Sequence, residues 1–147
     1  NEDGIAAVMG HEIAHAFAKH GQERMSTGKL QQYGGMALAI GTRNSKNAEL
    51  WNTAYGLGTQ VGIMLPFSRS HESEADKLGL VFMLMAGYEG AEAAEVWVRM
   101  SKLSGGKKGQ SQILSTHPSN ENRIKALRSF LPEAKQLAAK YNVPKRS

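Results

Sequence analysis

Apolar residues recur near the start of the chain at the spacing of an α-helix. The four that set this pattern are Ile5, Val8, Ile13 and Phe17. Their intervals lie close to the helical period of about 3.6 residues. Asn1 can cap such a helix ahead of two acidic residues, and Gly21 is a suitable stop. The pattern therefore predicts a helix from Asn1 to about His20.

The segment 26–67 is rich in Gly, Ala, Met and Thr, and the polar run 42–47 divides it. Two helices joined by a loop fit this pattern best. The stretch 50–68 carries no charge, and its length approaches the ~20 apolar residues that span a bilayer. Polar residues and glycines interrupt it, so a buried or groove-lining helix pair is the preferred interpretation over a membrane span.

The second half of the chain predicts further helices. Pro66 should end the uncharged segment, and a new helix should start near Ser70 and close at Ala86-Gly87-Tyr88. Another helix should cover about 91–103, followed by a Gly- and Lys-rich loop over 104–109.

Two prolines suggest where the last helices start. Pro118 suits the first turn of a helix, and Pro132 suits the start of a final helix towards Tyr141. No stretch has the pattern of a strand, so the predicted fold class is mainly α. The 147 residues fit one domain, and we expect a single unit over residues 1–147.

Composition narrows the candidate chemistry. The chain has no cysteine, so any metal must be held by histidine and carboxylate side chains. The net charge of +5 is a mild excess without the basic stripe and interleaved aromatics that nucleic-acid binding requires. A solvated basic surface is the preferred interpretation, and a weak preference for anionic membrane surfaces stays open.

The pentad His11-Glu12-Ile13-Ala14-His15 is the clearest chemical motif. Inside a helix, His11 and His15 lie one turn apart on the same face and can share one zinc ion. Glu12 is turned about 100° from His11, where it can act on a water beside the metal without ligating it. The motif predicts a metal-dependent hydrolase.

A catalytic zinc needs a third protein ligand. The position ten residues after His11 is Gly21, which excludes the metzincin pattern, and His20 lies about 140° from His15 and is interpreted as a surface residue. Glu72 and Asp76 share a helical face, so Glu72 can ligate while Asp76 supports a ligand histidine. A solvated acidic start of a helix explains the same pattern equally well.

The neighbour of Glu72, His71, faces elsewhere on the predicted helix and is also interpreted as a surface residue.

The pentad followed by Glu72-x-x-Ala75-Asp76 resembles the HExxH gluzincin metallopeptidases of the HtpX, CAAX prenyl protease and BepA-like type. Residues 1–8 are similar to the segment that leads into the metal helix of that family. Residues 115–118, which include His117, are similar to its late His-Pro element with Arg123 following. The resemblance covers nearly the whole chain and is strongest for the soluble periplasmic branch.

The resemblance implies a compact, zincin-like helical domain in which the metal helix packs on a second, ligand-bearing helix. It implies one Zn²⁺ held by His11, His15 and Glu72, with Asp76 as a supporting residue. His117 would stabilise the oxyanion or act as a reversible fourth ligand. Arg123 would contact substrate or hold a neighbouring side chain.

By the same resemblance, a substrate-side strand precedes the metal helix, and the chain begins just after its place. We therefore expect a fragment whose zinc site is complete and whose substrate binding is not.

The function that follows is a zinc-dependent endopeptidase that hydrolyses extended or unfolded polypeptides, with Glu12 as the catalytic base. The alternative is a metal-bound, chaperone-like binding module with latent or no peptidase activity. The resemblance also implies a periplasmic or otherwise exported location, with membrane association through upstream sequence.

Overall fold

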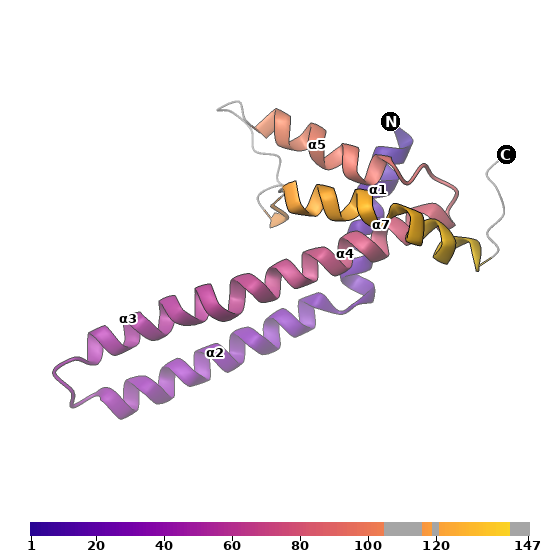
Figure 1. Ribbon diagram of the computed structural model, residues 1–147. Helices are drawn as coiled ribbons and strands as arrows, with labels where there is room; N and C mark the ends of the chain where they lie inside the picture. The colour runs from indigo at the N-terminus through magenta and orange to yellow at the C-terminus, as the bar shows by residue number, and fades with distance from the viewer. Residues whose placement is uncertain (105–115, 119–120, 142–147) are drawn as a thin grey trace. The chain divides into compact units, whose positions relative to one another are not determined.

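A computed structural model describes residues 1–104, 116–118 and 121–141, with the side chains of 65–67 and 104 left aside. All the elements in these ranges are helical, which confirms the mainly α prediction. They are α1 (Glu2–Phe17), α2 (His20–Thr42), α3 (Ala48–Thr59), the π-helical turn η1 (Gln60–Met64), α4 (Leu65–Met85), α5 (Glu92–Ser104) and α7 (Glu121–Ala139). Figure 1 shows these helices along the chain.

The chain divides into two compact units. The first unit comprises residues 1–18 and 72–147, and the second comprises residues 19–71. The boundary falls inside α4, between His71 and Glu72. A single catalytic domain over residues 1–147 stays a prediction.

The core of the first unit is formed by α1, α4, α5 and α7. Its buried side chains include Ala7, Leu80, Met83, Ala94, Trp97, Leu127 and Ala134. The buried residues of α1 are mostly small, so this helix can approach its neighbours closely. Asn1 caps α1 as predicted, because its side-chain oxygen accepts a hydrogen bond of 2.8 Å from the backbone N–H of Gly4.

Helices α1 and α4 approach each other closely at two glycines. A Cβ on Gly10 would lie 2.7 Å from the carbonyl oxygen of Gly79, and a Cβ on Gly79 would lie 2.7 Å from the backbone nitrogen of His11. Real Cβ contacts are not this short, so both positions require glycine. Helix α1 therefore packs on α4 through backbone atoms, directly beside His11.

The second unit is a helical hairpin, as the division of segment 26–67 predicts. Helices α2 and α3 lie side by side and are joined by residues 43–47 (Figure 1). Between the helices, Gln31 Nε2 donates to Thr59 Oγ1 at 2.7 Å, and the hydroxyl of Tyr55 donates to the carbonyl of Gln31 at 2.9 Å. A Cβ on Gly34 would collide with the hydroxyl of Tyr55. Small and polar residues thus form the seam.

The apolar side chains of segment 50–68 do not line a buried surface. Leu50, Trp51, Leu57, Val61 and Ile63 are each more than half exposed, so the prediction of a buried or groove-lining pair is wrong for them. Within the described ranges, no helix has both the length and the apolar character needed to cross a membrane.

Helix boundaries depart from prediction at three places. α1 ends at Phe17, and Lys19 takes the left-handed conformation (φ 58°), whereas the predicted stop, Gly21, lies within α2. Pro66 lies near the start of α4, directly after the π-helical turn η1, and the helical path continues past it from η1 into α4. Pro132 lies inside α7, which buries side chains on both sides of it and continues through to Ala139.

Other boundaries agree with prediction. α4 ends at Met85 and is followed by Gly87 with φ 81°, and α5 covers Glu92–Ser104. The predicted loop 104–109 lies outside the described residues, except for Ser104, which ends α5.

Candidate metal centre

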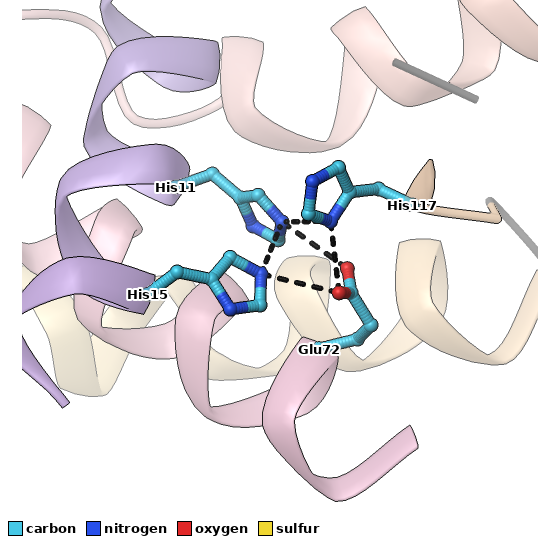
Figure 2. A group of neighbouring side chains, drawn as sticks. All are labelled: His11, His15, Glu72 and His117. Carbon is cyan, nitrogen blue, oxygen red and sulfur yellow. Dashed lines mark hydrogen bonds and ion pairs between the residues drawn. The ribbon is translucent and has the colours of Figure 1, made fainter. Parts of the chain in front are cut away.

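Helix α1 places the two histidines of the pentad on one face. The Nε2 atoms of His11 and His15 lie 3.1 Å apart. Helix α4 presents Glu72 to both rings, with one carboxylate oxygen 3.2 Å from Nε2 of His11 and the other 3.1 Å from Nε2 of His15. Figure 2 shows the three side chains pointing toward a common point.

A third histidine joins them from the segment before α7. Nδ1 of His117 lies 2.8 Å from a carboxylate oxygen of Glu72 and 3.4 Å from Nε2 of His11 (Figure 2). Each of the four residues offers one donor atom, and these atoms all lie within 4.8 Å of one another. Residues more than one hundred positions apart in the sequence thus meet at one point.

Hydrogen bonding alone does not explain this convergence. Nε2 of His11 has His15, Glu72 and His117 as neighbours, but a ring nitrogen offers only one proton or one lone pair. Ligands about 2.0–2.1 Å from a tetrahedral zinc ion lie roughly 3.3 Å apart. Nε2 of His11 lies 3.1 Å from Nε2 of His15 and 3.4 Å from Nδ1 of His117, and these two separations fit that geometry. The donor set can therefore hold one metal ion.

Asp76 and Arg123 hold the donor set in place by contacts outside it. Oδ1 of Asp76 lies 3.1 Å from Nδ1 of His11, on the side of the ring away from the other donors. Arg123 donates to both carboxylate oxygens of Asp76, from Nε at 2.8 Å and from Nη2 at 2.7 Å. Such bidentate pairing fixes the orientation of the carboxylate. Asp76 in turn fixes the ring orientation of His11.

Arg123 also reaches two other parts of the site. Its Nη1 lies 3.2 Å from a carboxylate oxygen of Glu72 and donates to the carbonyl of Pro118 at 2.7 Å. Because Pro118 follows His117, this bond anchors the backbone that carries the third histidine. The Arg123 side chain is buried, with 9% of its surface exposed. These contacts favour a positioning role for Arg123 over substrate contact.

Trp97 covers the same cluster from α5. Its ring stands edge-on to His11 with centroids 5.2 Å apart, and the guanidinium of Arg123 lies 4.7 Å from the centre of the indole. Sequence reasoning misses the place of Trp97 beside the cluster, because a tryptophan at helical spacing in an amphipathic helix gives no signal of a nearby metal centre.

The charges of the cluster shift two pKa values. Burial disfavours the charged form of His11, but Asp76 and Glu72 outweigh that effect, so the pKa of His11 is raised above its ordinary value. Burial also disfavours the ionised form of Glu72, but bonds from His11, His117 and His15 and the charge of Arg123 hold its pKa far below the usual range. Glu72 is therefore a permanent carboxylate.

Glu12 lies at the open edge of the cluster. Its side chain is 51% exposed, and one carboxylate oxygen lies 3.2 Å from Nε2 of His117. It is thus close to the donor set and accessible to water, and no donor atom of the cluster belongs to it.

His20 and His71 lie in the second unit and are not surface residues, so both predictions are wrong. They are 2% and 3% exposed, and their rings stack 4.1 Å apart. Nε2 of His71 pairs with Glu23 at 2.8 Å. Helical periodicity gives no signal of two imidazoles stacked against each other. Among the described residues, neither histidine joins the four-residue donor set.

Comparison with known proteins agrees with the resemblance drawn from the motifs. The family model described as Peptidase family M48 matches residues 1–131. Mitochondrial metalloendopeptidase OMA1 of Schizosaccharomyces pombe is 34% identical over 133 residues, which are 90% of this chain and 38% of that protein. The human enzyme of that name is 31% identical over 95% of this chain and 28% of its own length.

The β-barrel assembly-enhancing protease of Escherichia coli is 27% identical over 84% of this chain and 26% of its own length. The chain therefore spans less than two fifths of these three relatives. No solved structure matches it.

Proposed function

The chain belongs to peptidase family M48, and we propose that it is the catalytic part of a zinc-dependent endopeptidase. The convergence of His11, His15 and Glu72 beside the accessible carboxylate of Glu12 carries this proposal. These are the groups that a metal-assisted hydrolysis requires: neutral nitrogen and carboxylate donors, and a base within reach.

One zinc ion would be held by His11, His15 and Glu72. When bound, it supplies Lewis-acid activation of a water molecule and of the substrate carbonyl. Glu72 contributes a full negative charge because its pKa is held far below the usual range. Asp76, whose Oδ1 lies 3.1 Å from Nδ1 of His11, would accept the Nδ1 proton and leave the lone pair of Nε2 for the metal.

Glu12 would carry the protons of the reaction. It takes one proton from the attacking water and delivers it to the amine that leaves when the peptide bond breaks. Its exposure allows both the water and the substrate to reach it.

His117 would act as a reversible fourth ligand. Its Nδ1 lies among the donor atoms, which supports this role over that of an oxyanion donor held at a distance. Substrate could then reach the metal only when the His117 side chain leaves the fourth position, while Arg123 holds the backbone at the adjacent Pro118. Arg123 would be a positioning residue for Asp76, Glu72 and the backbone after His117.

The proposed substrates are extended or unfolded polypeptide segments. The two OMA1 relatives quoted above are named as mitochondrial enzymes. A periplasmic or exported location for this chain is therefore supported only by its resemblance to the periplasmic branch of the family. A chaperone-like module without cleavage is the second candidate, because a filled fourth position would keep substrate from the metal.

Glu12→Gln tests the proposal. The variant should bind one zinc ion as the parent chain does, since Glu12 is not in the donor set, and cleavage of an unfolded protein such as reduced casein should fall at least about a hundredfold. Glu133→Gln, on an exposed position of α7, is the matched control and should leave cleavage unchanged. Undiminished cleavage by Glu12→Gln would refute the mechanism. A parent chain that binds zinc and protects unfolded protein without cutting it would favour the chaperone-like module.

A further inference from the structure

Trp97 is a buried residue beside the metal centre to which the proposed mechanism gives no task. It lies on α5, and only 3% of its surface is exposed. Its ring stands nearly perpendicular to that of His11, with centroids 5.2 Å apart. The central carbon of the Arg123 guanidinium lies over the indole, 4.7 Å from its centre. One side chain therefore contacts both the first histidine of the pentad and the arginine that holds the donor set in place.

Two polar contacts link α5 to the helices on either side of the cluster. Ahead of α5, the backbone N–H of Glu89 donates to Oδ1 of Asp3, in the first turn of α1, at 3.0 Å. Within α5, a carboxylate oxygen of Glu95 accepts a hydrogen bond of 2.7 Å from Nη2 of Arg128 on α7. Trp97 follows Glu95 by two residues, so its indole is carried by a helix that is linked to both α1 and α7.

Every nitrogen of the Arg123 side chain has an oxygen partner. Nε and Nη2 donate to Asp76, while Nη1 donates to the carbonyl of Pro118 and lies 3.2 Å from a carboxylate oxygen of Glu72. Guanidinium donors point outward in the plane of the group, so an aromatic ring adds a different attraction, between the cation and the negative face of the ring. It is strongest for tryptophan and where water is excluded, and both side chains are buried here.

Core packing is the simpler interpretation of a buried tryptophan. Trp97 belongs to the hydrophobic core together with Ala94 and Leu127, and a core position requires only an apolar side chain of suitable volume. A position over a cation requires an aromatic face as well. The two interpretations therefore differ in what leucine would do at position 97, because leucine restores much of the apolar volume and none of the aromatic face.

We propose that Trp97 is a positioning residue of the metal centre and acts through Arg123. The indole holds the guanidinium in place, the guanidinium orients the carboxylate of Asp76, and Asp76 orients the ring of His11. The direct contact of Trp97 with His11 restrains the same ring a second time. This inference rests on the metal centre of the proposed function and adds a residue of α5 to it.

Zinc affinity, measured by chelator competition, tests the proposal. Trp97→Leu should bind zinc about 10–30-fold more weakly than the parent chain, as loss of an outer partner of the ligands does. Trp97→Phe keeps an aromatic face and should bind zinc only about threefold more weakly. Val96→Ala is the matched control, since Val96 lies in the same core but is turned about 100° from Trp97 on α5. It should lower the unfolding temperature and leave zinc affinity within about twofold.

A double-mutant cycle with Arg123→Gln separates positioning from packing. Glutamine removes the cation, so the indole has no charge to hold. In this background, Trp97→Leu should weaken zinc binding by no more than about threefold, whereas a loss of packing alone would weaken it equally in both backgrounds. Circular dichroism confirms that each variant is folded. If Trp97→Leu unfolds, Trp97→Phe carries the same comparison, because its smaller loss should disappear in the Arg123→Gln background.

Three results would overturn the role of Trp97 and leave the metal centre standing. The first is a folded Trp97→Leu chain that binds zinc as tightly as the parent chain. The second is an equal loss of affinity with and without the Arg123 cation. The third is a loss in Val96→Ala as large as that in Trp97→Leu, which would make core packing the cause. A parent chain that binds no zinc would instead overturn the proposed metal centre, and the role of Trp97 with it.

Discussion

Gly10 and Gly79 bring the backbones of α1 and α4 into direct contact beside His11. A Cβ on either residue would lie 2.7 Å from a backbone atom of the other helix. Backbone cannot move aside as a flexible side chain can. The distance from His11 to Glu72 therefore depends on two residues that have no donor atom of their own.

Gly79→Ala is expected to disturb both stability and metal binding. Forcing the helices apart should cost about 2–3 kcal/mol in the free energy of unfolding, which exceeds the ~1 kcal/mol that alanine gains over glycine by helix propensity. Zinc affinity should fall as well. Thermal unfolding and chelator competition measure the two effects. Gly28→Ala is the control, since a Cβ there meets nothing within 4 Å, and it should stabilise α2 slightly. A Gly79→Ala chain as stable as the parent would show that the contact is not tight.

Arg123→Lys is expected to weaken the site without unfolding the chain. Lysine keeps the charge but cannot pair in bidentate fashion with Asp76 or reach Pro118 at the same time. Zinc affinity should fall about 10–100-fold. At saturating zinc, kcat should fall while KM changes little, because the residue positions other groups.

Arg128→Lys, an exposed arginine of the same helix that pairs with Glu95, is the control for Arg123→Lys. A rise in KM alone for Arg123→Lys would instead assign Arg123 to substrate contact.

Metal binding should depend on pH through His11. Its pKa in the metal-free chain is raised above the ordinary value of 6.5, and a protonated ring cannot bind zinc. In the metal-free chain, the same shift contributes stability below pH 6.5 and loses it as pH rises through the raised pKa. Zinc affinity should therefore decline as pH falls through that raised pKa, by up to about tenfold per unit for each proton displaced.

Asp76→Asn isolates the cause of this shift. Removing the carboxylate beside Nδ1 of His11 takes away one of the interactions that raise the pKa, so the decline in affinity should move to lower pH. Zinc titrations over a pH series compare the two chains. An identical midpoint for parent and variant would contradict the role given to Asp76.

His117→Ala is expected to remove the fourth ligand and leave that position free for substrate. Three donors remain, so the variant should still bind one zinc ion, and turnover at saturating zinc should rise because substrate no longer displaces a ligand. A fall of about 10²–10³ in kcat would instead make His117 an oxyanion donor. Unchanged coordination and unchanged turnover would remove His117 from the site.

Local spacing is sufficient to predict part of the site. The pentad places His11 and His15 on one face because four residues make about one helical turn. The pairing of Glu72 with Asp76 is equally local, and its connection to the pentad comes from the resemblance to known metallopeptidases. The hairpin is predictable because the polar run 42–47 separates two weakly apolar halves.

Contacts between distant segments are not predictable in the same way. The approach of Gly10 to Gly79 depends on how two helices cross, and a glycine within a helix does not by itself indicate a close crossing. The helical angles of His20 and His71 say nothing about a second buried cluster, so they predict surface positions that the structure contradicts. Pro66 predicts a helix end, yet the helical path continues past it from η1 into α4.

The most direct test of the proposed metal centre is a crystal grown with zinc, with an anomalous difference map recorded at the zinc absorption edge. The donor set predicts one strong peak within bonding distance of Nε2 of His11, Nε2 of His15 and a carboxylate oxygen of Glu72, with Glu12 outside that distance. A peak that lacks Glu72, includes Glu12 or lies at another cluster would contradict the assignment.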